Sequence, residues 1–169
     1  MVVQMERRTK EITELSSVLW REREVMHLVL FKLTAERLVV SAAETRWLAD
    51  ANRELEGALE QLHNIEVLRA IESDALAEQL GLPSDATLSL LAQSVDEPWS
   101  VILAEHRDAL LQLAGEIADA VDLNRRLLEA GGKSIRETLM SITSSAGTYD
   151  ANGVADTARA RLSRLDEQA

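Results

Sequence analysis

The chain has 169 residues, enough for one domain of ordinary size, and hydrophobic residues make up 46% of it. Aromatic residues make up only 3%, with two prolines and seven glycines, which favours a helical protein over a sheet-rich one. The formal net charge of −11 speaks against a nucleic-acid-binding protein and against attraction to an anionic membrane surface. The chain has no cysteine, so it forms no disulfide and no thiolate metal site.

The beginning of the chain indicates where the protein works. Residues 1–10 are polar and charged and contain no apolar core of a signal peptide. No apolar run approaches the roughly 20 residues that a membrane-spanning helix needs. Together with the absence of cysteine, this pattern predicts a soluble, cytoplasmic protein without membrane insertion.

The first predicted helix covers residues 9–40, a stretch without glycine or proline. A helix of this length spans about 48 Å at about 1.5 Å per residue. Glu22 and Glu36 interrupt its apolar seam, and we expect them at the seam edges, with their carboxylates reaching solvent. The apolar seam recurs every seven residues and consists of Ile12, Leu19, Met26, Leu33 and Val40, with Leu15 and Val29 between them.

The second predicted helix covers residues 44–71. Ser41-Ala42-Ala43 is the expected connection, with Ser41 as the cap of the following helix. A single continuous helix over residues 9–71 remains an alternative. The second seam consists of Leu48, Leu55, Leu62 and Arg69, with Ala51, Ala58 and Ile65 between them.

A connector with short helices is predicted for residues 73–96. Ser73 is expected to open a short helix that ends before Gly81, because glycine is a common C-terminal cap. Pro83 then blocks any continuation. Ser84 or Asp85 is expected to open a further short helical turn that runs through Leu91.

The third predicted helix covers residues 97–129, with Asp96 as its cap and Pro98 in its first turn. Gly131-Gly132 are expected to interrupt or bend it. Its seam consists of Leu103, Leu110, Ile117 and Asn124, with Trp99, His106, Leu113, Ala120 and Leu127 between them. An apolar stripe displaced by one residue follows, formed by Leu128, Ile135, Leu139 and Ile142.

These elements predict an all-α fold. We expect an elongated antiparallel bundle of three long helices with short connector helices over residues 1–142, followed by a flexible C-terminal tail over residues 143–169. The tail ends in a helical stripe that is too short to be stable alone in water. Its apolar residues are Val154, Ala158, Leu162 and Leu165, and its basic residues, interpreted as a solvated face, are Arg159, Arg161 and Arg164.

Two Glu-x-x-His pairs are candidate metal ligands. Glu24 with His27, and Glu60 with His63, could each supply half of a carboxylate-bridged two-metal site in a helical bundle. Such a site requires side chains that face the bundle interior. Both pairs fall at heptad positions outside the seams, so we predict solvated side chains, no metal and no cofactor.

Three other side chains have a structural and a functional interpretation. His106 falls in the third seam and is predicted to be a core histidine that a neighbour satisfies, because no catalytic or phosphate-binding motif accompanies it. Asn124 also falls in this seam, where a buried Asn can fix the helix register. Trp20 lies outside the seam and either packs beneath the connector or tail, or marks a partner surface.

Two short elements carry a family likeness. Asn124, Leu127 and Leu128 form an Asn-x-x-Leu-Leu pattern that resembles an element late in the last core helix of FlgN-type flagellar export chaperones. Arg125 stands where many of these relatives have glycine. Tyr149, Ala151 and Gly153 form a Tyr-x-Ala-x-Gly pattern similar to one in the family's tail. The run from Leu15 to Glu24 is similar to actinobacterial members, and the likeness covers residues 10–153.

The resemblance implies a function. Such a protein is a cytoplasmic, non-enzymatic chaperone that binds hook-associated (hook–filament junction) proteins, prevents their premature assembly and delivers them to the type III export gate or its ATPase complex. The candidate client-binding residues are Ile135, Leu139, Ile142, Tyr149, Val154 and Leu162. The alternative is a structural coiled-coil module that forms a homodimer and has no client. Neither interpretation identifies the particular client.

Overall fold

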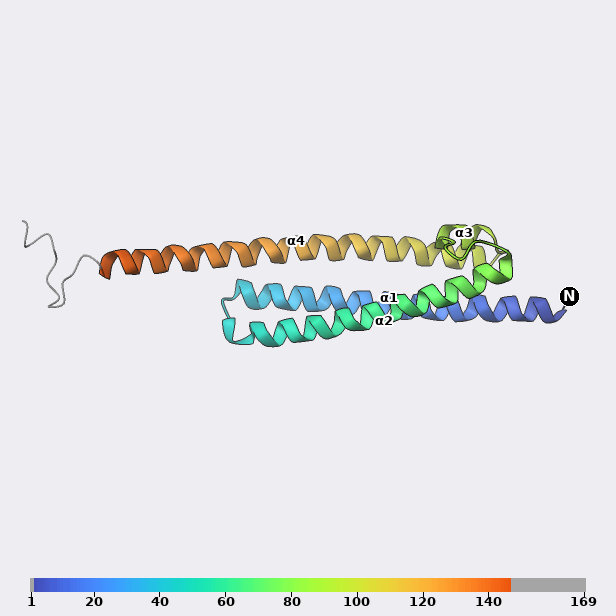
Figure 1. The fold of residues 1–169 in the computed structure, drawn as a ribbon, viewed down its shortest axis with the longest axis horizontal. Coiled ribbons are helices and arrows are strands. Elements are labelled where there is room, and N and C mark those ends of the chain that lie inside the picture. Colours follow the sequence, from blue (N-terminus) through green and yellow to red (C-terminus); the bar gives the residue numbers. More distant parts are fainter. Residues whose placement is uncertain (1, 147–169) are drawn as a thin grey trace, which may run out of the picture. The chain divides into compact units, whose positions relative to one another are not determined.

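The structure is a computed structural model that describes the backbone of residues 2–146 and, among their side chains, those of residues 6–134, 136–138 and 140. Its elements are α1 (Val2–Ser41), the 3-10 turn η1 (Thr45–Trp47), α2 (Leu48–Leu80), α3 (Leu88–Gln93) and α4 (Trp99–Ala146), all visible in Figure 1. Residues 2–146 contain no strand, so the predicted all-α fold is confirmed.

The chain divides into two compact units, Met1–Arg125 and Arg126–Ala169. The first unit contains α1, η1, α2, α3 and the first part of α4. The second unit begins within α4.

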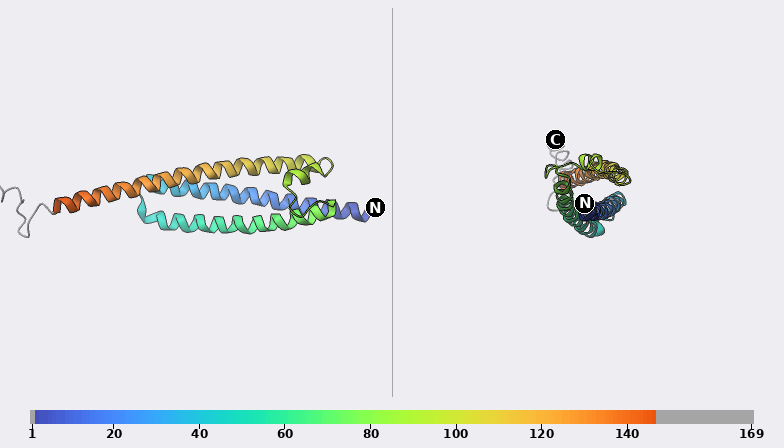
Figure 2. Two further views of the ribbon diagram at one scale, coloured as in Figure 1. Left: turned by 45° about the horizontal axis from the view of Figure 1, so that its top comes forward. Right: turned by 90° about the vertical axis from the view of Figure 1, so that its right-hand side faces the viewer.

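In the first unit, the three long helices follow an up-down-up course (Figures 1 and 2). The short turn after α1 sends α2 back alongside it. The first part of α4 then runs in the same direction as α1, because Ser16 meets His106 near one end and Leu33 meets Asn124 near the other. The predicted bundle of three long helices is confirmed.

The connection between α1 and α2 excludes one continuous helix. Helix α1 ends at Ser41, which is its last residue rather than the cap of α2. Ala43 adopts a left-handed φ of 56°, and the Glu44 N–H donates to the Val39 carbonyl, which closes the last turn. The prediction for the place of the connection is confirmed, and the capping role of Ser41 was wrong.

Helix α2 continues nine residues beyond the predicted end at residue 71. Ser73 opens no separate helix, because Leu76 and Ala77 of the same helix are fully buried in the core. Their burial outweighs the modest helix propensity of one serine. Gly81 ends the helix with a φ of 70°, and its N–H donates to the Ala77 and Glu78 carbonyls, so its predicted role as the cap is confirmed.

The short helix α3 begins later than predicted. Thr87 caps it, and the Thr87 Oγ1 accepts a hydrogen bond from the Leu90 N–H at 3.2 Å. Ser84 and Asp85 precede this cap, so they do not open the helix. Pro83 instead lies in the preceding turn, where its carbonyl accepts from the Ala86 N–H.

Helix α4 is longer than the sequence pattern indicated. It begins at Trp99, directly after Pro98, and the Asp96 backbone carbonyl accepts from the Ser100 N–H. It passes through Gly131-Gly132 without a break and continues to Ala146, four residues beyond Ile142. A glycine inside a helix costs only about 1 kcal/mol relative to alanine, so two of them among good helix formers do not end the helix.

Two clusters form the apolar core of the first unit, and the predicted seams supply most of it. One cluster joins all four helices and consists of Ile12, Leu15, Leu19, Leu76, Ala77, Leu91, Ala92 and Leu103. The other joins the three long helices and consists of Val29, Leu33, Ala58 and Ala120. Helices α1, α2 and α4 contribute to both clusters, and α1 supplies the most buried residues, so we call it the central helix of this unit.

Candidate functional site

Helix α1 presents three buried polar side chains to its neighbours. Ser16, Glu22 and Glu36 are 8%, 4% and 7% exposed. The prediction that the two glutamates reach solvent at the seam edges was wrong. The reason is that each of the three side chains meets a polar partner from α2 or α4, which offsets the cost of its burial.

Glu22 forms an ion pair with α2. The Arg69 Nε lies 3.0 Å from the Glu22 Oε2, and the Arg69 side chain is 39% exposed while that of Glu22 is 5% exposed. Burial raises the pKa of Glu22 above its ordinary value, Arg69 opposes this effect, and the negative charge of Glu66 adds to it. Desolvation is the largest cause, so this pair is no simple source of stability.

His106 of α4 lies against α1. Its Nε2 is 3.3 Å from the Ser16 Oγ, and its ring meets the Trp20 ring edge-on at 5.1 Å between centroids. Burial and then the nearby Arg23 charge lower the pKa of His106, while Glu105 raises it. The interpretation of His106 as a core histidine is confirmed, and Ser16 is the neighbour that its Nε2 meets.

This Ser–His pair does not have the arrangement of an activated nucleophile. A catalytic pair of this kind requires a third group that orients the imidazole, and access for a substrate. The His106 Nδ1 has no hydrogen-bond partner in the described part of the chain, and both side chains are buried. Trp20 packs on His106 rather than beneath the connector, and 54% of its surface is exposed. The Arg23 guanidinium lies over the Trp20 ring, 4.3 Å from the ring centroid.

Asn124 makes the third polar contact with α1. Its Nδ2 donates to the Leu33 carbonyl and to the Glu36 Oε2, each at 2.7 Å. The Asn124 side chain is 5% exposed. Both amide hydrogens therefore meet acceptors on α1, and this contact ties the end of the first unit's α4 segment to the central helix.

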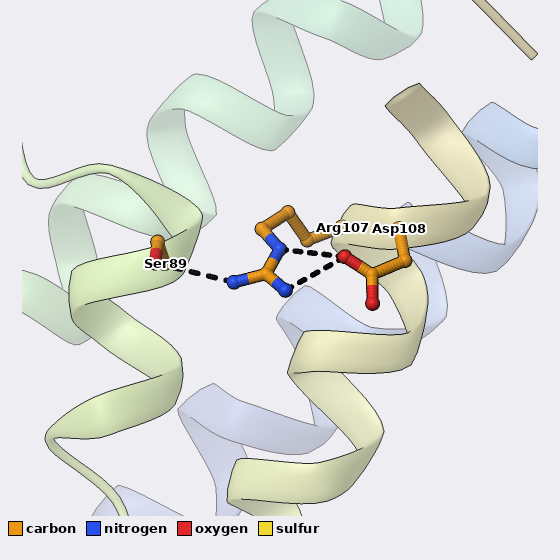
Figure 3. A network of polar contacts seen from close by, with 3 residues as sticks. All are labelled: Ser89, Arg107 and Asp108. Carbon is orange, nitrogen blue, oxygen red and sulfur yellow. Dashed lines mark hydrogen bonds and ion pairs between the residues drawn. The ribbon is translucent and has the colours of Figure 1, made fainter. Parts of the chain in front are cut away.

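A shallow hollow lies between α3 and α4. Arg107 spans it, since its guanidinium donates to the Ser89 Oγ at 3.2 Å and to the Asp108 carboxylate at 2.8 and 2.7 Å (Figure 3). The hollow has a volume of about 400 Å³ and is open to solvent. Ala92 and Ala104 line it together with polar residues that include Glu105 and Arg107, so it offers space for a small apolar group beside charged side chains.

The candidate metal ligands do not form a site. Glu24, His27, Glu60 and His63 are all exposed, so the prediction that both Glu-x-x-His pairs face outward is confirmed. Elsewhere in the described part of the chain, carboxylate oxygens of Glu11, Glu14 and Glu72 lie within 4.8 Å of one another. Partly exposed carboxylates commonly gather without a metal, so this cluster indicates no particular ligand.

The family-like residues divide between the two units. Asn124 is buried in the first unit, whereas Leu127 is half-buried and Leu128 is 41% exposed in the second. Among the described side chains from Arg126 onward, none is buried. Ile135, Leu139 and Ile142 lie within α4, but their side chains are outside the description. The remaining candidates, Tyr149, Ala151, Gly153, Val154 and Leu162, lie outside the described residues.

Sequence reasoning missed the partners of the buried polar groups. Glu22 and Arg69 both fall in predicted seams, and two opposite charges at seam positions are a usable signal for an ion pair. Glu36 and Asn124 likewise occupied seam positions of two different helices. Ser16 carried no such signal, because it lies outside the heptad positions assigned to the first seam.

Comparison with known proteins assigns the chain to a family. The family model described as FlgN protein matches residues 5–157, which is most of the chain. No curated protein and no solved structure matches it. No helix within the described residues is both long enough and apolar enough to span a membrane. The order of helices, the Asn-x-x-Leu-Leu element and this match agree, and the chain belongs to the FlgN family of flagellar export chaperones.

Proposed function

We propose that the chain is a cytoplasmic export chaperone whose clients are the hook-associated proteins of the hook–filament junction, and that it is not an enzyme. The family match supports a flagellar export chaperone in general. The observation that supports a client site in this chain is the exposure of the side chains of α4 beyond Arg125. This segment is helical to Ala146, yet none of its described side chains is buried.

The composition of this segment suits a partner helix. Leu128 is 41% exposed and Met140 is 74% exposed. Ile135 and Ile142 follow Leu128 at seven-residue spacing in the same helix, with Leu139 alongside. An amphipathic client helix packed on such a stripe would bury apolar surface worth about 25 cal/mol per Å².

We also propose that residues 143–169 extend this site, beyond a helical framework of residues 1–142. Tyr149, Val154 and Leu162 are the apolar candidates in this extension. If these residues become ordered only on the client, the entropy cost offsets part of the gain from burial and keeps the affinity moderate. Moderate affinity suits a chaperone, because the client must be released at the export gate or ATPase complex.

The test is calorimetry with purified hook-associated proteins from the same organism. Leu139→Ala combined with Ile142→Ala removes apolar surface from the proposed site and is expected to weaken binding about tenfold. Leu111→Ala is the matched control, because Leu111 is a 67% exposed residue of the same helix that lies in the first unit. Equal loss of affinity in both variants would contradict the proposed location of the site.

The same exposed stripe also supports the second candidate, a structural module that pairs with another copy of itself. Exposed Leu128 and Met140 could meet their counterparts in a homodimer. Sedimentation equilibrium separates the two functions. A stable dimer that dissociates in the Leu139→Ala, Ile142→Ala variant, with no client binding by the intact chain, would favour the structural module.

A further inference from the structure

Asn124 joins α4 to α1 through two buried hydrogen bonds. The Asn124 Nδ2 donates at 2.7 Å both to a backbone carbonyl, that of Leu33, and to a carboxylate oxygen of Glu36. The side chains of Asn124 and Glu36 are 5% and 7% exposed. Water therefore competes little for the hydrogen bond between these two groups, and loss of either side chain leaves the other with one buried polar partner fewer.

This contact distinguishes one register of α4 from its neighbours. The other residues of the same seam row, Leu103, Leu110 and Ile117, are aliphatic and repeat every seven residues, so the packing of this row tolerates a slip of one heptad. The polar contacts that His106 and Asn124 make with α1 oppose such a slip. A slip of α4 by seven residues toward the start of α1 would place Asn124 beside Met26 and Val29. Met26 would then present its backbone carbonyl as Leu33 does, but Val29 is a buried apolar side chain that offers no acceptor in place of the Glu36 carboxylate.

A slip in the opposite direction also fails. Seven residues beyond Leu33 and Glu36 stand Val40 and Ala43, at the end of α1 and in the turn that follows it. Neither side chain can accept a hydrogen bond. Asn124 and Glu36 form a hydrogen bond with each other only in the observed register. A buried polar pair of this kind specifies the register of helices in a bundle.

The position of Asn124 gives this register a consequence. Asn124 is the last buried side chain of α4 among those described, and the first unit ends at the next residue, Arg125. The register at Asn124 therefore determines where the part of α4 that packs on α1 ends and which residues of α4 follow it. A slip of one heptad would shift that point by about 10.5 Å along the helix, at about 1.5 Å per residue.

We propose that Asn124, held by Glu36, is a positioning residue for client capture. By fixing α4 against α1 at this level, it keeps Leu127 and the stripe from Leu128 onward outside the packed segment. This inference rests on the proposed function, because it assumes that the client binds that stripe. It explains why a polar residue occupies a seam position that an aliphatic side chain could fill.

The experiment uses the full chain and has two measurements. The absence of cysteine allows spin labels at His27→Cys on α1 and Asp119→Cys on α4, two exposed sites in the first unit. The main variant combines Asn124→Leu with Glu36→Leu, because removing both polar partners leaves no unpaired buried charge. Glu36→Gln is the control, since its side-chain carbonyl can still accept from Asn124.

The double variant is expected to be folded and to unfold at the same or a higher temperature than the parent. It should show a second inter-label distance and bind a hook-associated protein at least fivefold more weakly, whereas the control keeps one distance and binds within twofold of the parent. A merely structural contact would not lower affinity in a protein of undiminished stability.

Three outcomes would overturn the inference. A single, unchanged distance in the double variant would show that Asn124 does not fix the register. A second distance with unchanged client affinity would show that the register does not position the client site. If the intact chain binds no hook-associated protein, the proposed function fails and the inference fails with it. The distances, which need no client, still distinguish this case from a failure of the register argument alone.

Discussion

Arg69 of α2 reaches Glu22 of α1 inside the first unit, with its Nε 3.0 Å from the Glu22 Oε2. The carboxylate is almost fully buried and its pKa is raised, so desolvation outweighs the attraction of the arginine. This balance has a consequence for stability that can be measured. A carboxyl group with a raised pKa binds its proton more tightly in the folded protein than in the unfolded chain.

Glu22→Gln is therefore expected to change the pH dependence of unfolding. The stabilising effect of the raised pKa is fully present below the ordinary value of 4.5 and is lost as the pH rises through the folded pKa. The free energy of unfolding of the parent, minus that of the variant, should thus increase as the pH falls from 7 to 4.5. Urea unfolding at both pH values measures it, and a difference that stays constant or decreases would contradict the assignment.

His106→Gln is expected to show the opposite dependence. Burial lowers the pKa of His106 below 6.5, so the neutral ring stabilises the fold above that pH. This stability is lost as the pH falls from 6.5 through the folded pKa, because the unfolded chain then binds the proton more readily. Relative to the glutamine variant, the parent should become less stable between pH 7.5 and 5.5. Parallel pH profiles of the two proteins would contradict this.

Asn124→Asp should be strongly destabilising. It would place a second buried carboxylate against the Glu36 Oε2 and the Leu33 carbonyl, where the amide now donates at 2.7 Å. Breaking a buried polar contact and leaving an unpaired charge typically costs about 3–5 kcal/mol. Adding Glu36→Gln to this variant should restore part of the loss in urea unfolding. A single variant as stable as the parent would mean that the contact is dispensable.

The core of the first unit should respond differently at buried and exposed leucines. Leu19 is fully buried in the cluster that joins all four helices, so Leu19→Ala is expected to cost about 2–5 kcal/mol. Leu111 is 67% exposed, and Leu111→Ala should change the free energy of unfolding by less than about 0.5 kcal/mol. Thermal or urea unfolding tests both, and similar effects at the two sites would contradict the assigned core.

Much of this fold could be predicted from the sequence, because heptad periodicity reports which face of a helix is buried. Leu15, Val29 and Leu103 were placed in seams and are fully buried. Helix ends were harder to predict. Ser73 and Gly131-Gly132 are weak breakers of a helix, and the burial of neighbouring residues or the strength of flanking helix formers outweighs them.

The polar contacts between the helices could not be predicted as well from the sequence. The periodicity of α1 alone places Glu22 and Glu36 at the edges of its seam, where their carboxylates would reach solvent. Their burial depends on Arg69 from α2 and Asn124 from α4, which are distant in the sequence. Periodicity assigns a residue to a face of its helix, but it does not say which residue of a second helix lies at the same level.

The proposed function requires that this chain bind a hook-associated protein through the end of α4 and the residues beyond it. Calorimetric titration of a purified hook-associated protein with the intact chain, and with a chain that ends at Ile142, tests it most directly. We expect saturable binding by the intact chain and binding at least tenfold weaker, by about 1.4 kcal/mol, by the shortened one. Equal affinity would place the site upstream of Thr143. No binding by the intact chain to any such protein would contradict the proposed function.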